Sequence, residues 1–217
     1  MKILAVSDRI VKSIYSVHIR ERFGDVDMLL SCGDLPYSYL EFIVSMLNVP
    51  GFFVHGNHDH LEYQSSGRVL TAPGGWTDLD EQTGHFKGLI LAGLEGSIRY
   101  KPQGDYQYTE GQMRFKVWRM LPTLLLNRLR YGRFVDVLIT HSPPLGIHDS
   151  DDCCHRGFKA LLWFMDRFHP RYLIHGHKHV YKPEPRQTRY KETEVINAYP
   201  FFVLDLDDEL RMKEGAE

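Results

Sequence analysis

Short apolar runs recur along the chain, bounded by glycine, proline or polar residues. Most are too short for a helix, and runs of this kind form strands that are buried in a sheet. The sequence therefore predicts strands at residues 2–6, 26–31, 51–54, 89–94, 135–139, 172–174 and 201–206.

Between these runs lie segments in which apolar residues recur at helical spacing. The first of them would place Ile10, Ile14 and Val17 on one face of a helix. The third is expected to be helical only in part, because Pro122 demands a break or a new helix start. The predicted helical segments are residues 10–23, 39–47, 112–130 and 157–168.

Strands that alternate with helices predict an α/β fold, in which helices cover the faces of a sheet. Residues 76–94 and 189–206 look like hairpins, so the sheet is predicted to be mixed, or to consist of two packed sheets. The chain has 217 residues, 43% of them hydrophobic, which is enough for one sizeable core. We therefore expect residues 1–217 to form a single domain.

The composition narrows the classes of partner. A formal net charge of -2 gives no basic footprint, so binding to a nucleic-acid duplex is not expected. No apolar run reaches membrane-spanning length, and Ser7 and Asp8 cut the N-terminal run too short for a signal peptide. The 3 cysteines imply no disulfide framework. We expect a soluble cytoplasmic protein without a membrane partner.

Polar residues directly follow five of the apolar runs. In an open α/β sheet the carboxyl ends of the strands meet along one rim, where ligands bind. We therefore expect these clusters to converge, so that they supply Asp8, Asp34, Asn57 and several His to that rim. They are Ser7-Asp8, Gly33-Asp34, residues 55–59, residues 140–144 and residues 175–179.

Carboxylate, amide and imidazole donors together suit Zn, Mn or Fe rather than Ca. Glycine precedes Asp34, Asn57 and His177, and it permits tight turns that aim a short side chain at an ion. His177 and His179 would project the same way from an extended segment. Taken singly, Asp8 could cap a helix and Asp34 could be a turn residue. The ordered occurrence of all five clusters favours a metal centre.

The ordered clusters resemble the pattern of the calcineurin-like metallophosphoesterases, which runs D-x-H, G-D, G-N-H-D/E, a later H, and G-H-x-H. The likeness covers nearly the whole chain. It implies an α/β fold with two packed mixed β-sheets flanked by helices, a four-layer sandwich. Residues 93–97 and 143–146 resemble a small single-domain branch of that family.

The resemblance implies a site with two metal ions. Asp8 and His179 would hold one ion, Asp34 would bridge both, and the other ligands would hold the second. His58 would lie beside the reacting phosphate, with Asp59 and Asp34 as its orienting or acidic neighbours. The implied metal ligands are Asp8, Asp34, Asn57, His141, His177 and His179.

One element departs from the family pattern, because the D-x-H motif reads Asp8-Arg9-Ile10. An apolar side chain stands where the family has a histidine ligand. The first ion would keep Asp8, Asp34, His179 and solvent, and three protein ligands are the number that many catalytic zinc sites use. We expect a weaker or more exchangeable first site, still able to bind an ion.

The segment from His148 to Gly157 follows His141 closely, and a plain solvated loop is the favoured reading of it. In the alternative reading the segment folds over the site. His155 and Arg156 are then candidates for contacts with the phosphate, as is Asn57, and His155 is a candidate for the missing donor. The role of His148 stays open.

We therefore expect a phosphoesterase that uses two Mn, Fe or Zn ions to hydrolyse a small phosphodiester or phosphomonoester. The expected reaction is attack of a metal-activated hydroxide on the phosphate. A non-catalytic scaffold that binds metal or a phosphate ligand is the alternative, with a first site weakened by Ile10. A hydrolase that uses Ser142 as nucleophile is disfavoured, because no Gly-x-Ser-x-Gly elbow surrounds that residue.

Overall fold

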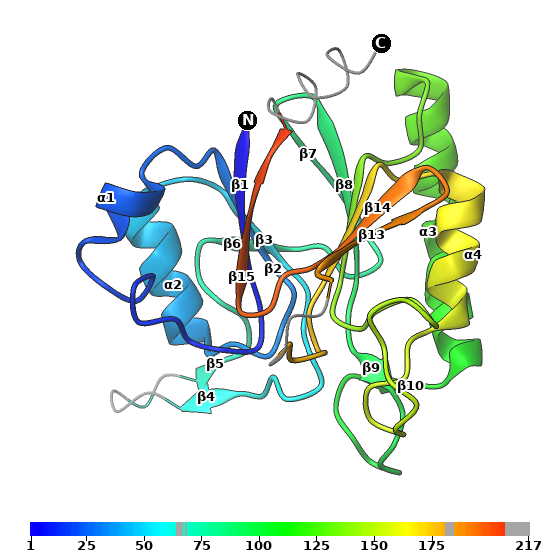
Figure 1. Cartoon of the computed structure of the whole chain (residues 1–217), viewed down its shortest axis with the longest axis horizontal. Helices are drawn as coiled ribbons and strands as arrows, with labels where there is room; N and C mark the ends of the chain where they lie inside the picture. Colours follow the sequence, from blue (N-terminus) through cyan, green and yellow to red (C-terminus); the bar gives the residue numbers. More distant parts are fainter. Residues whose placement is uncertain (64–66, 68, 181–184, 207–217) are drawn as a thin grey trace.

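Two β-sheets packed face to face form the centre of the protein, with helices covering both outer faces (Figure 1). The structure is a computed structural model that describes residues 1–63, 67, 69–180 and 185–206. This four-layer α/β arrangement confirms the predicted fold class.

The first sheet holds most of the N-terminal strands. In spatial order its strands are β15 (Phe201–Asp205), β1 (Lys2–Val6), β2 (Met28–Ser31), β3 (Gly51–Phe53) and β6 (Trp76–Asp78). The last four run parallel, and β15 pairs antiparallel with β1. Its outer face is covered by α1 (Ile19–Phe23) and α2 (Tyr37–Leu47).

The second sheet is also mixed. In spatial order its strands are β13 (Gln187–Tyr190), β14 (Thr193–Asn197), β12 (Tyr172–His175), β11 (Val137–Thr140), β8 (Leu89–Leu94) and β7 (Thr83–Phe86). The four inner strands run parallel, and the two edge strands are antiparallel to their neighbours. Its outer face is covered by α3 (Glu110–Tyr131) and α4 (Lys159–Phe168).

Two small strand pairs lie near the same end of the molecule, the lower end in Figure 1. They are β4 (Glu62–Tyr63) with β5 (Val69–Leu70), and β9 (Ser97–Ile98) with β10 (Gln107–Tyr108). Among the described residues, no helix is both long enough and apolar enough to cross a membrane.

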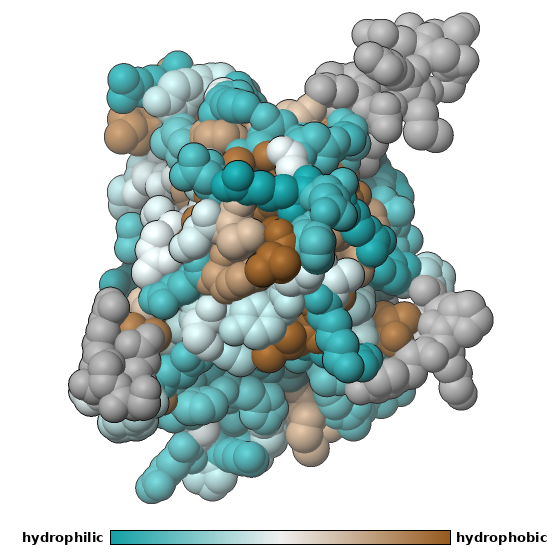
Figure 2. Space-filling model, turned by 90° about the vertical axis from the view of Figure 1, so that its left-hand side faces the viewer, coloured by the Kyte–Doolittle hydropathy of each residue, from teal (hydrophilic) through white to brown (hydrophobic). Residues whose placement is uncertain are grey.

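The apolar runs form strands because both faces of each sheet are covered. In β1, Ile3 and Ala5 pack into the layer between the sheets, while Leu4 and Val6 pack against the α1 and α2 side. A strand buried on both faces needs an unbroken apolar run rather than alternation. Figure 2 looks onto the α1 and α2 side, where mainly hydrophilic residues surround small apolar patches.

The helix predicted at residues 10–23 is much shorter in the structure. Residues 10–18 form turns, and α1 begins only at Ile19. Ile14 is buried, but Ile10 and Val17 are 43% and 71% exposed, so the segment has no continuous apolar face to stabilise a helix. The predictions for residues 39–47 and 157–168 are confirmed by α2 and α4.

The break expected at Pro122 does not occur, and α3 continues through this residue. The helix starts with a capping box made by Thr109 and Gln112. Its inner face packs Val117 and Leu124 into the apolar layer under the second sheet. Pro122 is exposed, so its ring meets no packed neighbour, and the packing of the inner face offsets the hydrogen bond that proline cannot make.

One of the two predicted hairpins is confirmed. Within residues 76–94, β7 and β8 form an antiparallel hairpin, while β6 joins the other sheet beside β3. Within residues 189–206, β14 and β15 lie in different sheets, and residues 198–200 carry the chain between them. The second predicted hairpin is wrong, because β15 pairs with β1 from the other end of the chain, which a local sequence pattern does not specify.

Candidate metal centre

The loops that carry the predicted ligands meet at the carboxyl ends of the parallel strands of both sheets. The Asp8 amide donates to the Gly33 carbonyl at 3.1 Å, which joins the loops after β1 and β2. The His177 amide donates to both carboxylate oxygens of Asp8, at 3.1 and 2.9 Å, which joins the two sheets. The convergence expected from the strand ends is therefore present in the fold.

One group of ligands surrounds the His141 imidazole, which is fully buried. Its Nε2 atom lies 3.4 Å from Asp34 Oδ2 and 3.0 Å from Asn57 Oδ1. Donor atoms of Asp34, His141 and His177 all lie within 4.8 Å of one another, a spacing that could hold one metal ion. These three residues and Asn57 come from four different strand ends.

A second group lies beside the first and contains the remaining predicted ligands. His179 Nε2 is 3.6 Å from Asp8 Oδ1, and the Asp8 side chain is almost fully buried. The His179 ring stacks on Tyr199, with ring centres 4.5 Å apart, which fixes its orientation. Ile10, the residue in the family's histidine position, is partly exposed and offers no donor.

The backbone is strained at three predicted ligands. Asp8, Asp34 and His177 have φ angles of 63°, 57° and 63°, in the left-handed region that residues other than glycine seldom occupy. Such conformations cost about 1–2 kcal/mol each and persist where the surrounding structure enforces them. The turns aim each of these side chains into the space shared by the two sheets.

The donor set fits a metal ion of the Mn, Fe or Zn kind. His141 Nδ1 lies 2.7 Å from the Cys32 carbonyl, and His177 Nε2 lies 2.7 Å from the Cys154 carbonyl. Carbonyls in these places hold the N–H of a ligand histidine and leave the other ring nitrogen for the ion. Oxygen and imidazole donors without thiolate match these metals.

A sequence profile of the calcineurin-like phosphoesterases matches residues 1–181, which is most of the chain. The chain belongs to the calcineurin-like phosphoesterase family. It thereby joins a family of metal-dependent enzymes that act on phosphate esters.

Solved structures share the fold of this chain. One aligns with a TM-score of 0.64 at 18% identity, over 95% of both chains. The crystal structure of TT1561 of Thermus thermophilus aligns with a TM-score of 0.58 at 12% identity, over 91% of this chain and 88% of that one. A search of curated proteins finds no match. These likenesses establish the architecture alone.

The predicted ligands differ in charge because each changes the pKa of its neighbours. Burial alone would lower the pKa of His141, but the Asp34 carboxylate beside it raises that pKa to about 9. Burial would raise the pKa of Asp34, but the same pairing and the His58 amide lower it to about 2. Burial and the neighbouring His141 lower the pKa of His177 to about 4, so this ring is neutral near pH 7.

Metal binding is expected to release a proton from His141. With a pKa of about 9 the ring is protonated at neutral pH, and an ion that takes Nε2 must displace that proton. Proton release should be near one per ion bound at His141 around pH 7 and should decline as the pH approaches 9. Calorimetry in buffers of different ionisation enthalpy measures it. A release that stays constant over this range would contradict the raised pKa.

Gly56 lies directly against two ligands. A Cβ atom there would be 2.1 Å from Asp34 Oδ1 and 2.6 Å from His141 Cε1. We expect Gly56→Ala to displace both side chains and to weaken Mn2+ binding at least about tenfold. Gly111→Ala is the control, because outside its own helix the nearest atom to its Cβ would be 3.9 Å away. Equal Mn2+ affinity in both variants, measured by calorimetry, would contradict this placement.

Asp59 holds two of the ligand loops together. Its carboxylate accepts hydrogen bonds from the amides of Asp34 and Leu35 at 3.1 Å and from the Gly56 amide at 2.8 Å. Burial and the nearby Asp34 charge raise the pKa of Asp59 to about 6. These three hydrogen bonds all come from backbone amides, which makes Asp59 a positioning residue for the loops after β2 and β3.

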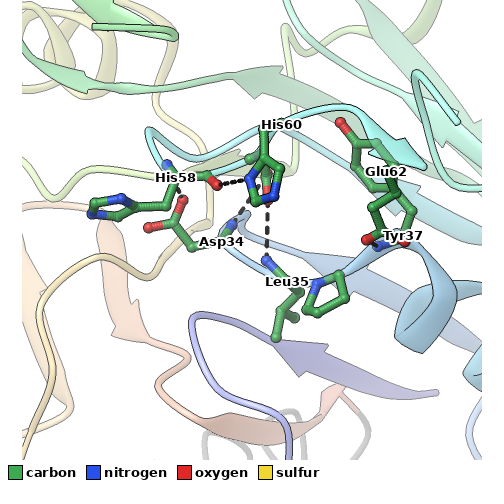
Figure 3. Close-up of a pocket in the computed structure, with 8 residues that line it drawn as sticks. Asp34, Leu35, Tyr37, His58, His60 and Glu62 are labelled. Carbon is green, nitrogen blue, oxygen red and sulfur yellow. Dashed lines mark hydrogen bonds between the residues drawn. The ribbon is translucent and has the colours of Figure 1, made fainter. Parts of the chain in front are cut away.

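His58 is exposed at the rim of the site. Its amide donates to Asp34 Oδ1 at 2.7 Å, while its imidazole points away from His60, as Figure 3 shows. A cavity of about 220 Å³ beside it is lined by Asp34, Tyr37 and Glu62 among others. His58 thus lies where a bound phosphate ester could reach it from solvent.

Of the candidate residues in the segment after His141, one lies near the metal centre and two point elsewhere. His155 reaches the centre, with its ring 5.1 Å from that of His177 and its Nδ1 atom 2.9 Å from Asp152. Arg156 lines another cavity, together with Glu110 and Lys159 among others, which none of the predicted ligands borders. His148 turns away as well, and its Nδ1 is 3.0 Å from His175 Nε2 in the protein interior.

Several residues of the site were not found from the sequence. Tyr100 accepts a hydrogen bond at its hydroxyl from Asn57 Nδ2, at 3.2 Å, and so orients that amide. The carbonyls of Cys32 and Cys154 orient the two buried histidines. Backbone groups leave no residue-type signal, and Tyr100 lies in a segment without a motif.

Proposed function

We propose that this protein hydrolyses a small phosphodiester or phosphomonoester at a centre of two Mn, Fe or Zn ions. The observation that supports this most is the convergence of predicted ligands from five strand ends. Asp34, His141 and His177 form one cluster, and Asp8 and His179 lie beside it. Bound ions would supply an activated water and would stabilise the negative charge that develops on the phosphate.

The protein's own residues have separate tasks in this proposal. Asp34 lies 3.4 Å from His141, and its carboxylate would bridge the two ions and supply negative charge to both. Asn57 would offer its carbonyl oxygen to the second ion, while its amide nitrogen donates a hydrogen bond to Tyr100. His58 lies at the solvent-facing rim, where it donates a proton or a hydrogen bond to the leaving oxygen.

His155 is proposed to contact the phosphate ester. Its ring lies against that of His177, and its Nδ1 atom is engaged by the Asp152 carboxylate. The Nε2 atom is then the one that can face a substrate oxygen. Arg156 has no such position, because it borders a different cavity.

Restoring the missing donor is expected to strengthen the first site. Ile10 is partly exposed, so a histidine there costs little apolar burial. We expect Ile10→His to bind Mn2+ about tenfold more tightly at the weaker site. Titration calorimetry measures this, and Val17→His, a histidine introduced at another exposed apolar position, is the control. If Ile10→His and the parent bind Mn2+ equally well at the weaker site, position 10 does not face the ion.

Metal analysis combined with an activity assay tests the proposal. Purified protein titrated to saturation with Mn2+ should bind two ions per chain and, in the presence of Mn2+, hydrolyse bis(p-nitrophenyl) phosphate or p-nitrophenyl phosphate. Chelation should abolish turnover and added Mn2+ should restore it. One ion per chain without turnover would instead support the non-catalytic scaffold, and no bound ion would contradict both functions.

A further inference from the structure

The outer face of α3 carries large apolar side chains in solvent. Phe115, Trp118 and Leu129 are 64%, 61% and 86% exposed, and Leu125 and Leu126 are also more than half exposed. The opposite face of the helix already packs against the second sheet through Met113, Val117, Met120 and Leu124. The exposed apolar residues therefore take no part in packing α3 against the second sheet.

Four of these residues, together with Pro122, follow a regular helical spacing. Phe115, Trp118, Pro122, Leu125 and Leu129 are separated by three and four residues in turn, which is the a and d pattern of a helix that packs along a second helix, and Leu126 borders this stripe. A seam of this kind is narrower than the broad apolar face of a helix that lies in a membrane surface. With 22 residues, α3 is about 33 Å long, enough for three heptads of contact.

Basic residues flank this stripe on both sides. Arg114 and Arg128 lie along one edge, and Arg119 and Arg130 along the other, from their positions around the helix. Glu110, at the first turn, is the sole acidic residue between positions 110 and 131. Two copies of this face would set arginine against arginine, which disfavours self-association through it.

We propose that the outer face of α3, defined by Phe115, Trp118, Leu125, Leu126 and Leu129, docks an acidic amphipathic helix of a partner protein. Apolar residues of that helix would fill the stripe, and its flanking glutamates or aspartates would meet the arginines. A hollow of about 310 Å³ lined by Gly111, Arg114, Phe115 and Trp118 gives one apolar anchor a place to enter. The proposal is independent of the phosphoesterase reaction.

Fluorescence anisotropy with a synthetic probe tests this docking. The probe is a four-heptad helical peptide with leucine at a and d and glutamate at the flanking positions. The full chain should bind it, more weakly as salt rises. The double variant Leu125→Asp/Leu129→Asp should bind at least tenfold more weakly. Val17→Asp, which changes an exposed apolar residue in the segment leading to α1, should bind like the parent.

Three further measurements test whether the outer face of α3 binds a basic helix, a membrane or a second copy of the protein instead. The same peptide with lysine in place of glutamate should not bind, and vesicles of phosphatidylserine and phosphatidylcholine should not sediment the protein. Equal binding of both peptides, no loss in the double variant, or binding to neither peptide would overturn the proposal. Stripe-dependent vesicle binding would replace it by a membrane surface. Self-association that the double variant abolishes would replace it by a second copy.

Discussion

Asp34→Asn is expected to remove bound metal and to lower the rate of phosphodiester hydrolysis by at least about 10³-fold. The substitution keeps the shape of the side chain but removes the charge that lies 3.4 Å from His141 Nε2. Without that charge the buried cluster loses the carboxylate that we propose to bridge the two ions. The affinity for both ions should fall, because Asp34 is the ligand that they would share.

Metal content by mass spectrometry and the rate with bis(p-nitrophenyl) phosphate measure this effect. Asp25→Asn is a matched control. Asp25 is exposed, lies before β2 and away from the predicted ligand loops, and pairs with Lys2. Circular dichroism shows whether Asp34→Asn stays folded. A folded variant with the parent's metal content and rate would mean that Asp34 is not a ligand.

Lys116→Met is expected to destabilise the protein by about 3–5 kcal/mol, which corresponds to a melting temperature about 10 °C lower. The ammonium of Lys116 is buried on the inner side of α3 and lies 2.7 Å from Asp80 and 3.2 Å from both Glu81 and Glu95. It also sits 4.2 Å from the centre of the Tyr108 ring. Its removal leaves buried carboxylates that repel one another without a counter-charge.

Thermal melting followed by circular dichroism measures this loss. Arg119→Met is the control, because Arg119 pairs with Glu81 from an exposed position, where an ion pair is worth about 0–1 kcal/mol. Adding Glu95→Gln to the lysine variant should recover part of the stability by removing one of the repelling charges. A Lys116→Met melting temperature equal to that of the control would contradict the assigned role of the cluster.

The cluster of Lys116 with Asp80, Glu81 and Glu95 is also connected to the metal centre by contacts between side chains. Glu95 contacts Lys116 with one carboxylate oxygen and His55 Nδ1 with the other, at 3.2 and 3.1 Å. His55 directly precedes Gly56, whose backbone packs against Asp34. Destabilising the cluster should therefore also loosen the ligand loop after β3, and Mn2+ affinity of Lys116→Met should fall more than that of Arg119→Met.

The strands and the ligand clusters were predictable because their signals are local. Each run such as residues 2–6 is apolar on both faces, and the polar residues that follow it mark the end of a strand. Because parallel strands end at one rim, the sequence alone predicted that Asp8, Asp34 and His141 lie close together. The family pattern added the roles of these residues.

The missed features depend on contacts between distant segments. The apolar residues of 10–18 suggested a helix, but they do not share one packed surface. Pro122 stays inside α3 because the helix is held by packing along its inner face. Lys116 looks like a surface residue in the sequence, and only the approach of Asp80 and Glu95 makes its burial favourable.

A crystal structure of the Mn2+-loaded protein with inorganic phosphate, with anomalous differences recorded for manganese, tests the metal centre most directly. We predict two peaks about 3.5–4 Å apart. One should contact Asn57, His141 and His177, the other Asp8 and His179, and Asp34 should touch both. Manganese bound elsewhere, or absent while these six side chains are ordered around an empty site, would contradict the account.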